Sequence, residues 1–277
     1  MLTKMSEILG QAKKGSYGVP ALGAVDELTL RACIDAAEEM RSPMIILCMH
    51  NSNKDLNYFG RILTDLAVRS TVPIATMLDH TPTFESAVAG IRAGFNAIMV
   101  DRSSLPYKEN LAQVKELVRI AHAVDIEVEA ELGHVGFEDG SDTDFDLVFT
   151  VPEEAVSFVE ESGIECLAVS IGTSHGAYKG KPQLQFDLLQ ELAEKVKVPL
   201  ALHGGSGTGD ENLTRACRLG ISKVNIVNDL YRNAFNTVIQ DGMEGNRIYS
   251  LLPTLSMGYK EKAMHFMKVF GSEGKAW

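Results

Sequence analysis

The sequence has few cysteines, no basic run and no long apolar segment, and each shortage narrows the possibilities. Its four cysteines among 277 residues are isolated, which predicts reduced, buried thiols in a cytosolic protein rather than a disulfide scaffold. No apolar run is long enough to cross a membrane, and the opening residues have helical apolar spacing rather than a secretory core. We therefore expect a soluble, cytoplasmic protein.

Positive charge is also in short supply. The chain has 26 Lys and Arg against 37 Asp and Glu, a net charge of -11, and the basic residues form no cluster along the sequence. This balance argues against nucleic acid and against an anionic membrane surface as partners. If the ligand is a phosphate, a few lysines and backbone N–H groups must bind it against the overall field.

Short apolar runs alternate with helical segments along most of the chain. The runs lack period-two alternation, which is typical of parallel strands buried on both faces. We expect one domain over residues 1–277, a closed (β/α)8 barrel of the usual length with an extra C-terminal helix at 255–270. A doubly wound open sheet is the alternative. The eight predicted strands are 17–22, 43–49, 72–78, 97–100, 127–132, 166–171, 199–202 and 223–226.

The helices expected between these strands follow from apolar residues at helical spacing. The first ends at about residue 14 and precedes the barrel. A long irregular segment at 133–150, rich in acids, separates the fifth strand from its helix. The other predicted helices are 27–40, 56–69, 83–93, 111–124, 152–162, 186–196, 210–219 and 229–241.

Three histidines each stand just past the C-terminal end of a predicted strand: His80, His175 and His203. Because these strand ends meet at one rim of a parallel barrel, we expect the three side chains to converge as metal ligands. Asp79, beside His80, would face the substrate as a general acid or base. An isolated Asp-His pair is better explained as a helix cap and a hydrogen-bonded histidine, but two further strand-end histidines favour the metal site.

A turn of small residues follows His203. Gly204, Gly205 and Ser206 can offer N–H groups and a hydroxyl to an anion, although an ordinary strand-to-helix turn explains the glycines equally well. Asn225 and Asn228 end the last predicted strand, and loops after strands seven and eight commonly bind phosphate in such barrels. Turn formation and helix capping are the alternative roles for the two asparagines.

Five motifs, in order along the chain, carry a resemblance to a known family. They are LDH ending at His80, EAELG ending at Gly133, GTSHG ending at Gly176, LHGGS ending at Ser206 and KVN ending at Asn225. Together they resemble the class II, metal-dependent ketose-bisphosphate aldolases, and within these the shorter tagatose-bisphosphate and fructose-bisphosphate aldolases. The resemblance runs from about residue 9 to residue 271.

The resemblance implies a zinc centre and two proton-transfer groups. His80, His175 and His203 match its zinc ligands, and Asp79 matches the acid or base that acts on the C4 hydroxyl when the C3–C4 bond breaks or forms. Glu138 matches the glutamate that moves the C3 proton of dihydroxyacetone phosphate. The family pattern also implies a second metal position beside Asp101 and Glu131, and allows a monovalent cation.

The substrate contacts are carried over in the same way. The positions that match those binding the phosphate and hydroxyls of dihydroxyacetone phosphate are Gly176, Gly204, Gly205, Ser206, Asn225 and Asn228, with Lys179 as a further phosphate contact. No Schiff-base lysine is required, because zinc would act as the Lewis acid.

The chain departs from the family at several positions, two of them where a second phosphate would bind. At those two, Met49 replaces a serine after the second strand and Pro253 stands where an arginine is usual. Gly23 replaces an asparagine after the first strand, so one substrate-side amide is missing. The distal group is therefore predicted to be something other than an ordinary phosphate: a neutral end, a deoxy end or a sulfonate. Its expected contacts are His50, Asn51 and Asn53, and a rearranged site using Lys260 or Lys262 is the competing explanation.

The resemblance thus implies an aldolase that converts a ketose 1-phosphate, or a substrate like a ketose 1,6-bisphosphate, into dihydroxyacetone phosphate and an aldehyde. A metal-dependent sugar-phosphate epimerase on the same barrel is the alternative, and a barrel that has lost its chemistry is a third possibility. The expected partners are a small sugar phosphate and further copies of the chain, as a dimer or tetramer.

Overall fold

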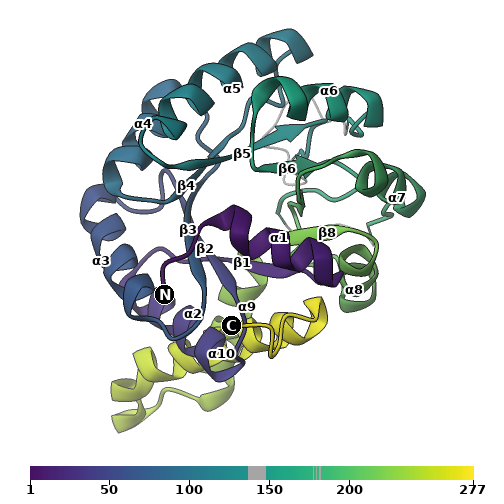
Figure 1. The fold of residues 1–277 in the computed structure, drawn as a ribbon. Helices are drawn as coiled ribbons and strands as arrows, with labels where there is room; N and C mark the ends of the chain where they lie inside the picture. Colours follow the sequence, from purple (N-terminus) through teal and green to yellow (C-terminus); the bar gives the residue numbers. More distant parts are fainter. Residues whose placement is uncertain (137–147, 177, 179, 181) are drawn as a thin grey trace.

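A computed structural model of the protein describes residues 1–136, 148–176, 178, 180 and 182–277. Its parallel strands close into a barrel in the order β1 to β8, with β8 paired to β1, which rules out the open sheet (Figure 1). The predicted (β/α)8 barrel is confirmed. The strands are β1 (Val19–Gly23), β2 (Met44–Met49), β3 (Ile74–Asp79), β4 (Ala97–Val100), β5 (Glu127–Leu132), β6 (Cys166–Val169), β7 (Leu200–Leu202) and β8 (Ile221–Ile226).

The helices lie close to their predicted positions, and most of them surround the barrel (Figure 1). Two begin earlier than predicted, α5 at Tyr107, directly after Pro106, and α10 at Leu251, two residues before Pro253. A short 3-10 helix before α10 is an addition. The helices are α1 (Met5–Gly15), α2 (Glu27–Glu39), α3 (Leu56–Arg69), α4 (Phe84–Ala93), α5 (Tyr107–His122), α6 (Pro152–Ser162), α7 (Phe186–Lys195), α8 (Asp210–Arg218), α9 (Asn228–Asp241), η1 (Gly245–Ser250) and α10 (Leu251–Phe270).

Helix α1 closes the N-terminal end of the barrel, and Figure 1 shows it lying across the strands. Its buried face of Met5, Ile8 and Leu9 packs against the inward side chains of several strands. The Ser6 backbone N–H and hydroxyl both donate to the Glu127 carboxylate on β5. This end of the barrel is therefore plugged, and the opposite rim is left for chemistry.

Strand β5 corrects the prediction that no strand alternates. Val128, Ala130 and Leu132 belong to the core between strands and helices. The alternate residues are three buried glutamates, Glu127, Glu129 and Glu131. Glu127 accepts hydrogen bonds from α1, Glu129 accepts from His203 and Lys223, and Glu131 accepts from the Val135 backbone N–H. The barrel interior thus contains a row of acids that rises from the plugged end to the rim.

The C-terminal helices complete the outer layer. Helix α10 packs against α2, α8 and α9, and the Tyr259 hydroxyl donates to the Gly23 carbonyl oxygen at the end of β1. Figure 1 shows the neighbouring ends of α9 and α10 projecting beyond the barrel wall. No helix in the described part of the chain is both long and apolar enough to span a bilayer.

Candidate active site

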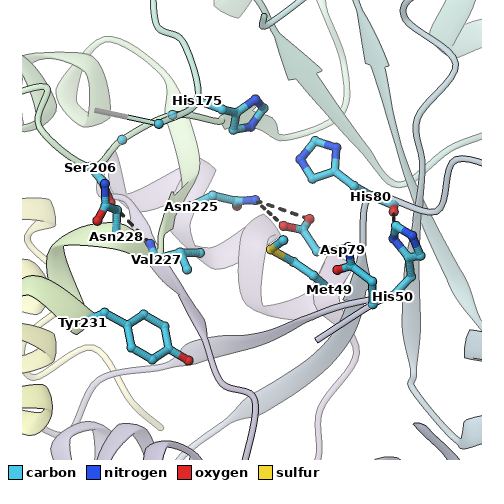
Figure 2. Close-up of a pocket in the computed structure, with 14 residues that line it drawn as sticks. Met49, His50, Asp79, His80, His175, Ser206, Asn225, Val227, Asn228 and Tyr231 are labelled. Atoms are coloured by element: carbon cyan, nitrogen blue, oxygen red, sulfur yellow. Dashed lines mark hydrogen bonds between the residues drawn. The ribbon is translucent and has the colours of Figure 1, made fainter. Parts of the chain in front are cut away.

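His80, His175 and His203 meet at the C-terminal rim of the barrel, as predicted. Their ring centroids lie 5.0 Å apart for His80 and His175, 4.9 Å for His80 and His203, and 5.8 Å for His175 and His203. One nitrogen from each ring lies within 4.8 Å of the other two. Figure 2 shows the His80 and His175 rings next to each other, and their planes are nearly perpendicular, at 81°. Three imidazoles so arranged suit a tetrahedral metal with one open position.

The second nitrogen of each ring lies against an acceptor that cannot donate. These nitrogens must therefore carry hydrogen, so the lone pairs that could bind a cation are those on His80 Nε2, His175 Nε2 and His203 Nδ1. The three contacts are His80 Nδ1 to Asp101 Oδ2 at 2.9 Å, His175 Nδ1 to the Val135 carbonyl oxygen at 3.2 Å and His203 Nε2 to Glu129 Oε1 at 2.9 Å.

The backbone at His80 is in the left-handed region, with φ at 44°. Few residues other than glycine adopt this conformation, and those that do cluster at functional sites. His50 supports it, because its Nδ1 lies 2.9 Å from the His80 carbonyl oxygen and donates to it. His50 is predicted as a contact for the distal group, and it also holds His80, one of the three converging histidines, in position.

Asp101 and Glu131 form a second potential metal group with His80. Ser103 donates to Asp101 through both its backbone N–H and its hydroxyl, at 3.0 and 2.8 Å, and Val135 N–H donates to Glu131 at 3.0 Å. Burial and the neighbouring Asp101 carboxylate raise the pKa of Glu131 to about 8. Both predicted carboxylates are thus beside the centre.

Asp79, at the end of β3, is buried, with 3% of its surface exposed. The Asn225 amide nitrogen lies 3.2 Å from Asp79 Oδ2 and 3.4 Å from Asp79 Oδ1, and Figure 2 draws both contacts. Asn225 Oδ1 in turn accepts from Lys223 Nζ at 2.7 Å, which fixes the orientation of the amide. The carboxylate therefore faces the site beside His80 with a single amide donor.

A pocket of about 530 Å³ opens over these groups. It collects residues from the ends of β2, β3, β7 and β8 and from the loops that follow β6 and β8. Asn53, by contrast, donates to the Val25 carbonyl oxygen and is not part of the lining. Glu138 and Lys179 lie outside the described residues. The lining is Met49, His50, Asn51, Asp79, His80, His175, Gly176, Gly204, Gly205, Ser206, Asn225, Val227, Asn228 and Tyr231.

The glycines after β7 are required by the backbone. Gly204 has φ at 65°, and a Cβ there would come within 2.2 Å of the Ser174 carbonyl oxygen. Tyr178 bridges the same two loops, since its hydroxyl donates to the Gly204 carbonyl oxygen at 2.8 Å and accepts from Ser174 N–H at 2.9 Å. The shape of the turn is therefore held by contacts within the protein.

Helix α9 begins at the pocket. The Ser206 hydroxyl accepts hydrogen bonds from the backbone N–H groups of Val227 and Asp229, both at 3.3 Å. Among the described residues, the backbone N–H groups of Gly204, Ser206 and Asn228 have no protein acceptor. These donors, at the positive end of α9, form a surface suited to a phosphate.

The far side of the pocket is mostly apolar. Val227 fills the space beside Gly23, where a Cβ would lie 3.0 Å from the valine Cγ2 atom, and Met49 and Tyr231 line the same region. The lining contains no lysine or arginine among the described residues.

The two lysines suggested for a rearranged site are engaged elsewhere. Lys260 is paired with Glu39 at 2.7 Å, and Lys262 lies over the Phe266 ring, with its Nζ 4.8 Å from the ring centroid.

Among the described residues near the three histidines, five received no role from the sequence: Glu129, Tyr178, Lys223, Val227 and Tyr231. Glu129 and Lys223 stood within motifs, but their contact joins β5 to β8 across 94 residues of sequence. The available signal was that Glu129 and Lys223, two oppositely charged residues, occupy strand positions that point into the barrel, where each charge needs a partner.

The fold and the site together define a (β/α)8 barrel whose rim carries three histidines that could hold a metal ion. The sequence matches the family described as Fructose-bisphosphate aldolase class-II over residues 3–275. The fructose-bisphosphate aldolase of Thermus caldophilus is 36% identical over 310 aligned residues, covering 100% of both chains. That of Geobacillus stearothermophilus is 34% identical over 284 residues, covering 99% of both. The crystal structure of the YdjI aldolase from Escherichia coli K12 has a TM-score of 0.90 at 33% identity, with 100% of both chains covered.

The chain therefore belongs to the class-II fructose-bisphosphate aldolase family. It is a lyase of the class that cleaves carbon–carbon bonds, and the predicted family resemblance is confirmed. Enzymes of this class typically depend on a metal ion, and the described residues include groups of histidines and carboxylates that could hold one.

Proposed function

We propose that the protein is a zinc-dependent aldolase that reversibly cleaves a ketose 1-phosphate into dihydroxyacetone phosphate and an aldehyde. One observation carries the proposal: three histidine nitrogens, each with its tautomer fixed, face one another beside the buried Asp79 carboxylate. Metal ligands and a proton-transfer group are thus available at the same end of one pocket.

The donor set fits zinc. His80, His175 and His203 would hold the ion through nitrogen atoms and leave a position for the substrate. Zinc bound there supplies a Lewis acid for the carbonyl oxygen of the substrate. Asp101 and Glu131 are proposed to offer a second metal position through the group they form with His80.

Asp79 is proposed to move the proton of the C4 hydroxyl. Its carboxylate is buried beside His80, and the Asn225 amide nitrogen approaches both of its oxygens, at 3.2 and 3.4 Å. Because each carboxylate oxygen has two lone pairs, the group can still accept a proton from the substrate. Glu138 is proposed for the C3 proton on the strength of its motif, and it lies outside the described residues.

The phosphate of dihydroxyacetone phosphate is proposed to bind at the start of α9. The support is the group of backbone donors from Gly204, Ser206 and Asn228, which attract an anion without a net positive charge on the protein. Gly176 and Gly205 also line this side of the pocket, and Lys179 is proposed as a further contact.

The aldehyde half is proposed to lack an ordinary phosphate. Met49, Val227 and Tyr231 give the far side of the pocket an apolar surface, with His50 and Asn51 at its edge. A phosphate dianion there would lose its charge-assisted donors, each worth roughly 1.5–3 kcal/mol. A neutral, deoxygenated or sulfonated end avoids that loss or reduces it.

The test is a screen of ketose 1-phosphates and 1,6-bisphosphates with triose phosphate release read by a coupled reductase. The proposal expects zinc-dependent release of dihydroxyacetone phosphate. An epimerase would convert the substrate without releasing dihydroxyacetone phosphate. A barrel that has lost its chemistry would not convert the substrate at all. Running the reaction in the aldol direction, with phosphorylated, sulfonated and neutral aldehydes, identifies the second product.

The protein is also proposed to form a homo-oligomer, a dimer or tetramer. Large apolar side chains are exposed on the projecting helices, among them Phe235 and Ile239 on α9, Tyr249 on η1 and Leu252 on α10. Apolar groups gathered in one region commonly mark a contact between chains. Light scattering during size-exclusion chromatography measures the mass directly, and a monomer at micromolar concentration would contradict this part of the proposal.

A further inference from the structure

Lys223 is a lysine with no exposed surface, inside the barrel on β8. Lysine is almost never fully buried unless it is paired, because removing the ammonium group from water is costly. Its partners are Glu129 Oε1 at 2.8 Å and Asn225 Oδ1 at 2.7 Å. Neither contact needs a substrate, and the ammonium group is not part of the pocket lining.

The contact with Glu129 extends to a metal ligand. Glu129 Oε1 accepts from Lys223 Nζ and, at 2.9 Å, from His203 Nε2. The other oxygen, Oε2, is buried with no protein partner among the described residues. Lys223 therefore holds the carboxylate oxygen that fixes the His203 tautomer, and without it His203 Nε2 is the one donor that remains to this carboxylate among the described residues.

The contact with Asn225 extends to the proton-transfer group. Because Asn225 Oδ1 accepts from Lys223, its amide nitrogen must face the opposite way, 3.2 Å from Asp79 Oδ2. An amide rotated by half a turn would present oxygen to the Asp79 carboxylate, and the two would repel. The ammonium group thus selects the orientation in which Asn225 donates to Asp79.

We propose that Lys223 is a positioning residue that aligns two parts of the site at once: His203 through Glu129, and Asp79 through Asn225. The second half rests on the proposed function, since it assigns proton transfer to Asp79, while the first half concerns metal binding alone. A purely structural ion pair is the competing explanation, because Glu129 and Lys223 also neutralise each other inside the barrel.

Two variants separate these explanations. Lys223→Met removes the ammonium group at similar volume but leaves a buried carboxylate unpaired, so it will be less stable. Lys223→Met combined with Glu129→Gln removes both charges and should unfold at a temperature close to that of the wild type. Ser222→Ala, a buried neighbour on the same strand whose hydroxyl has no protein partner among the described residues, is the matched control.

The first readout is the zinc dissociation constant, from competition with a chromophoric chelator, measured without substrate and well below the unfolding temperature. Loss of a group that supports a metal ligand typically weakens binding by 10- to 100-fold. We expect a rise of about that size in both variants and none in Ser222→Ala. The second readout, at saturating zinc, is a fall in kcat of about 10-fold or more with KM changed less than threefold.

The inference is overturned if the double variant matches the wild type in stability, in zinc affinity and in kcat. It is equally overturned if Lys223→Met folds, loses stability and keeps wild-type zinc affinity. Should the wild type release no triose phosphate from any ketose phosphate, the proposed function fails, while the zinc measurement still decides whether Lys223 positions His203.

Discussion

Two carboxylates, Asp79 and Asp101, flank His80, and we expect their replacement to have opposite effects: one lowers kcat and the other lowers zinc affinity. Asp79 is buried with one amide donor, from Asn225 at 3.2 Å, and makes no hydrogen bond to the histidine rings among the described residues. Replacing it as Asp79→Asn keeps the shape and removes the base. We expect kcat to fall by about 10²–10⁴-fold, roughly 2.7–5.4 kcal/mol of barrier, while zinc affinity stays within about threefold.

Asp101 acts on the metal through His80 instead. Its Oδ2 accepts from His80 Nδ1 at 2.9 Å, and Asp101→Ala removes the group that fixes that ring. Zinc binding should weaken by about 10- to 100-fold, and activity should recover largely when zinc is raised.

The assay for both variants is the coupled reductase rate across a zinc titration, with zinc content measured by atomic emission. The reasoning is refuted if Asp79→Asn turns over at the wild-type rate, or if it loses zinc in parallel with activity. Zinc binding by Asp101→Ala that matches the wild type would show that the His80 contact does not support the metal.

Three further predictions follow from the pocket and its loops. Gly204→Ala should destabilise the fold by about 1–2 kcal/mol because of its left-handed backbone alone, and by more because the added Cβ meets the Ser174 carbonyl oxygen. Gly10→Ala, in a helix with open space around it, is the control and should stabilise the fold by about 0.5–1 kcal/mol. Urea unfolding measures both free energies, and equal effects would contradict the geometry. The ratio of kcat/KM for fructose or tagatose 1,6-bisphosphate to that for the corresponding 1-monophosphate should stay well under 100; a preference of that size, about 2.7 kcal/mol, would prove a distal phosphate site. Glu138→Gln should slow exchange of the C3 proton of dihydroxyacetone phosphate with solvent at unchanged zinc content, and wild-type exchange would move that role elsewhere.

The sequence was most informative where a local pattern repeats. Eight apolar runs, each followed by a helix, were enough for the barrel, because parallel strands buried on both faces require such runs. The positions of His80, His175 and His203 after their strands were enough to predict that they converge, since a barrel rim gathers its strand ends.

Contacts that join distant strands could not be predicted from the sequence. Lys223 and Glu129 meet only because β5 and β8 face each other across the barrel, and Tyr178 bridges two loops whose conformations depend on packing. Helix starts were missed beside prolines. Helix α5 begins at Tyr107, directly after Pro106, and α10 begins at Leu251, two residues before Pro253. Proline suits a helix start but does not mark one by itself.

The central claim is that three histidines form the metal centre of this enzyme. Anomalous X-ray diffraction at the zinc edge, from crystals grown with one equivalent of zinc, tests it most directly. The account predicts an anomalous peak at about 2.0–2.1 Å from His80 Nε2, His175 Nε2 and His203 Nδ1. A crystal containing zinc with no peak within bonding distance of His175 and His203 would contradict it.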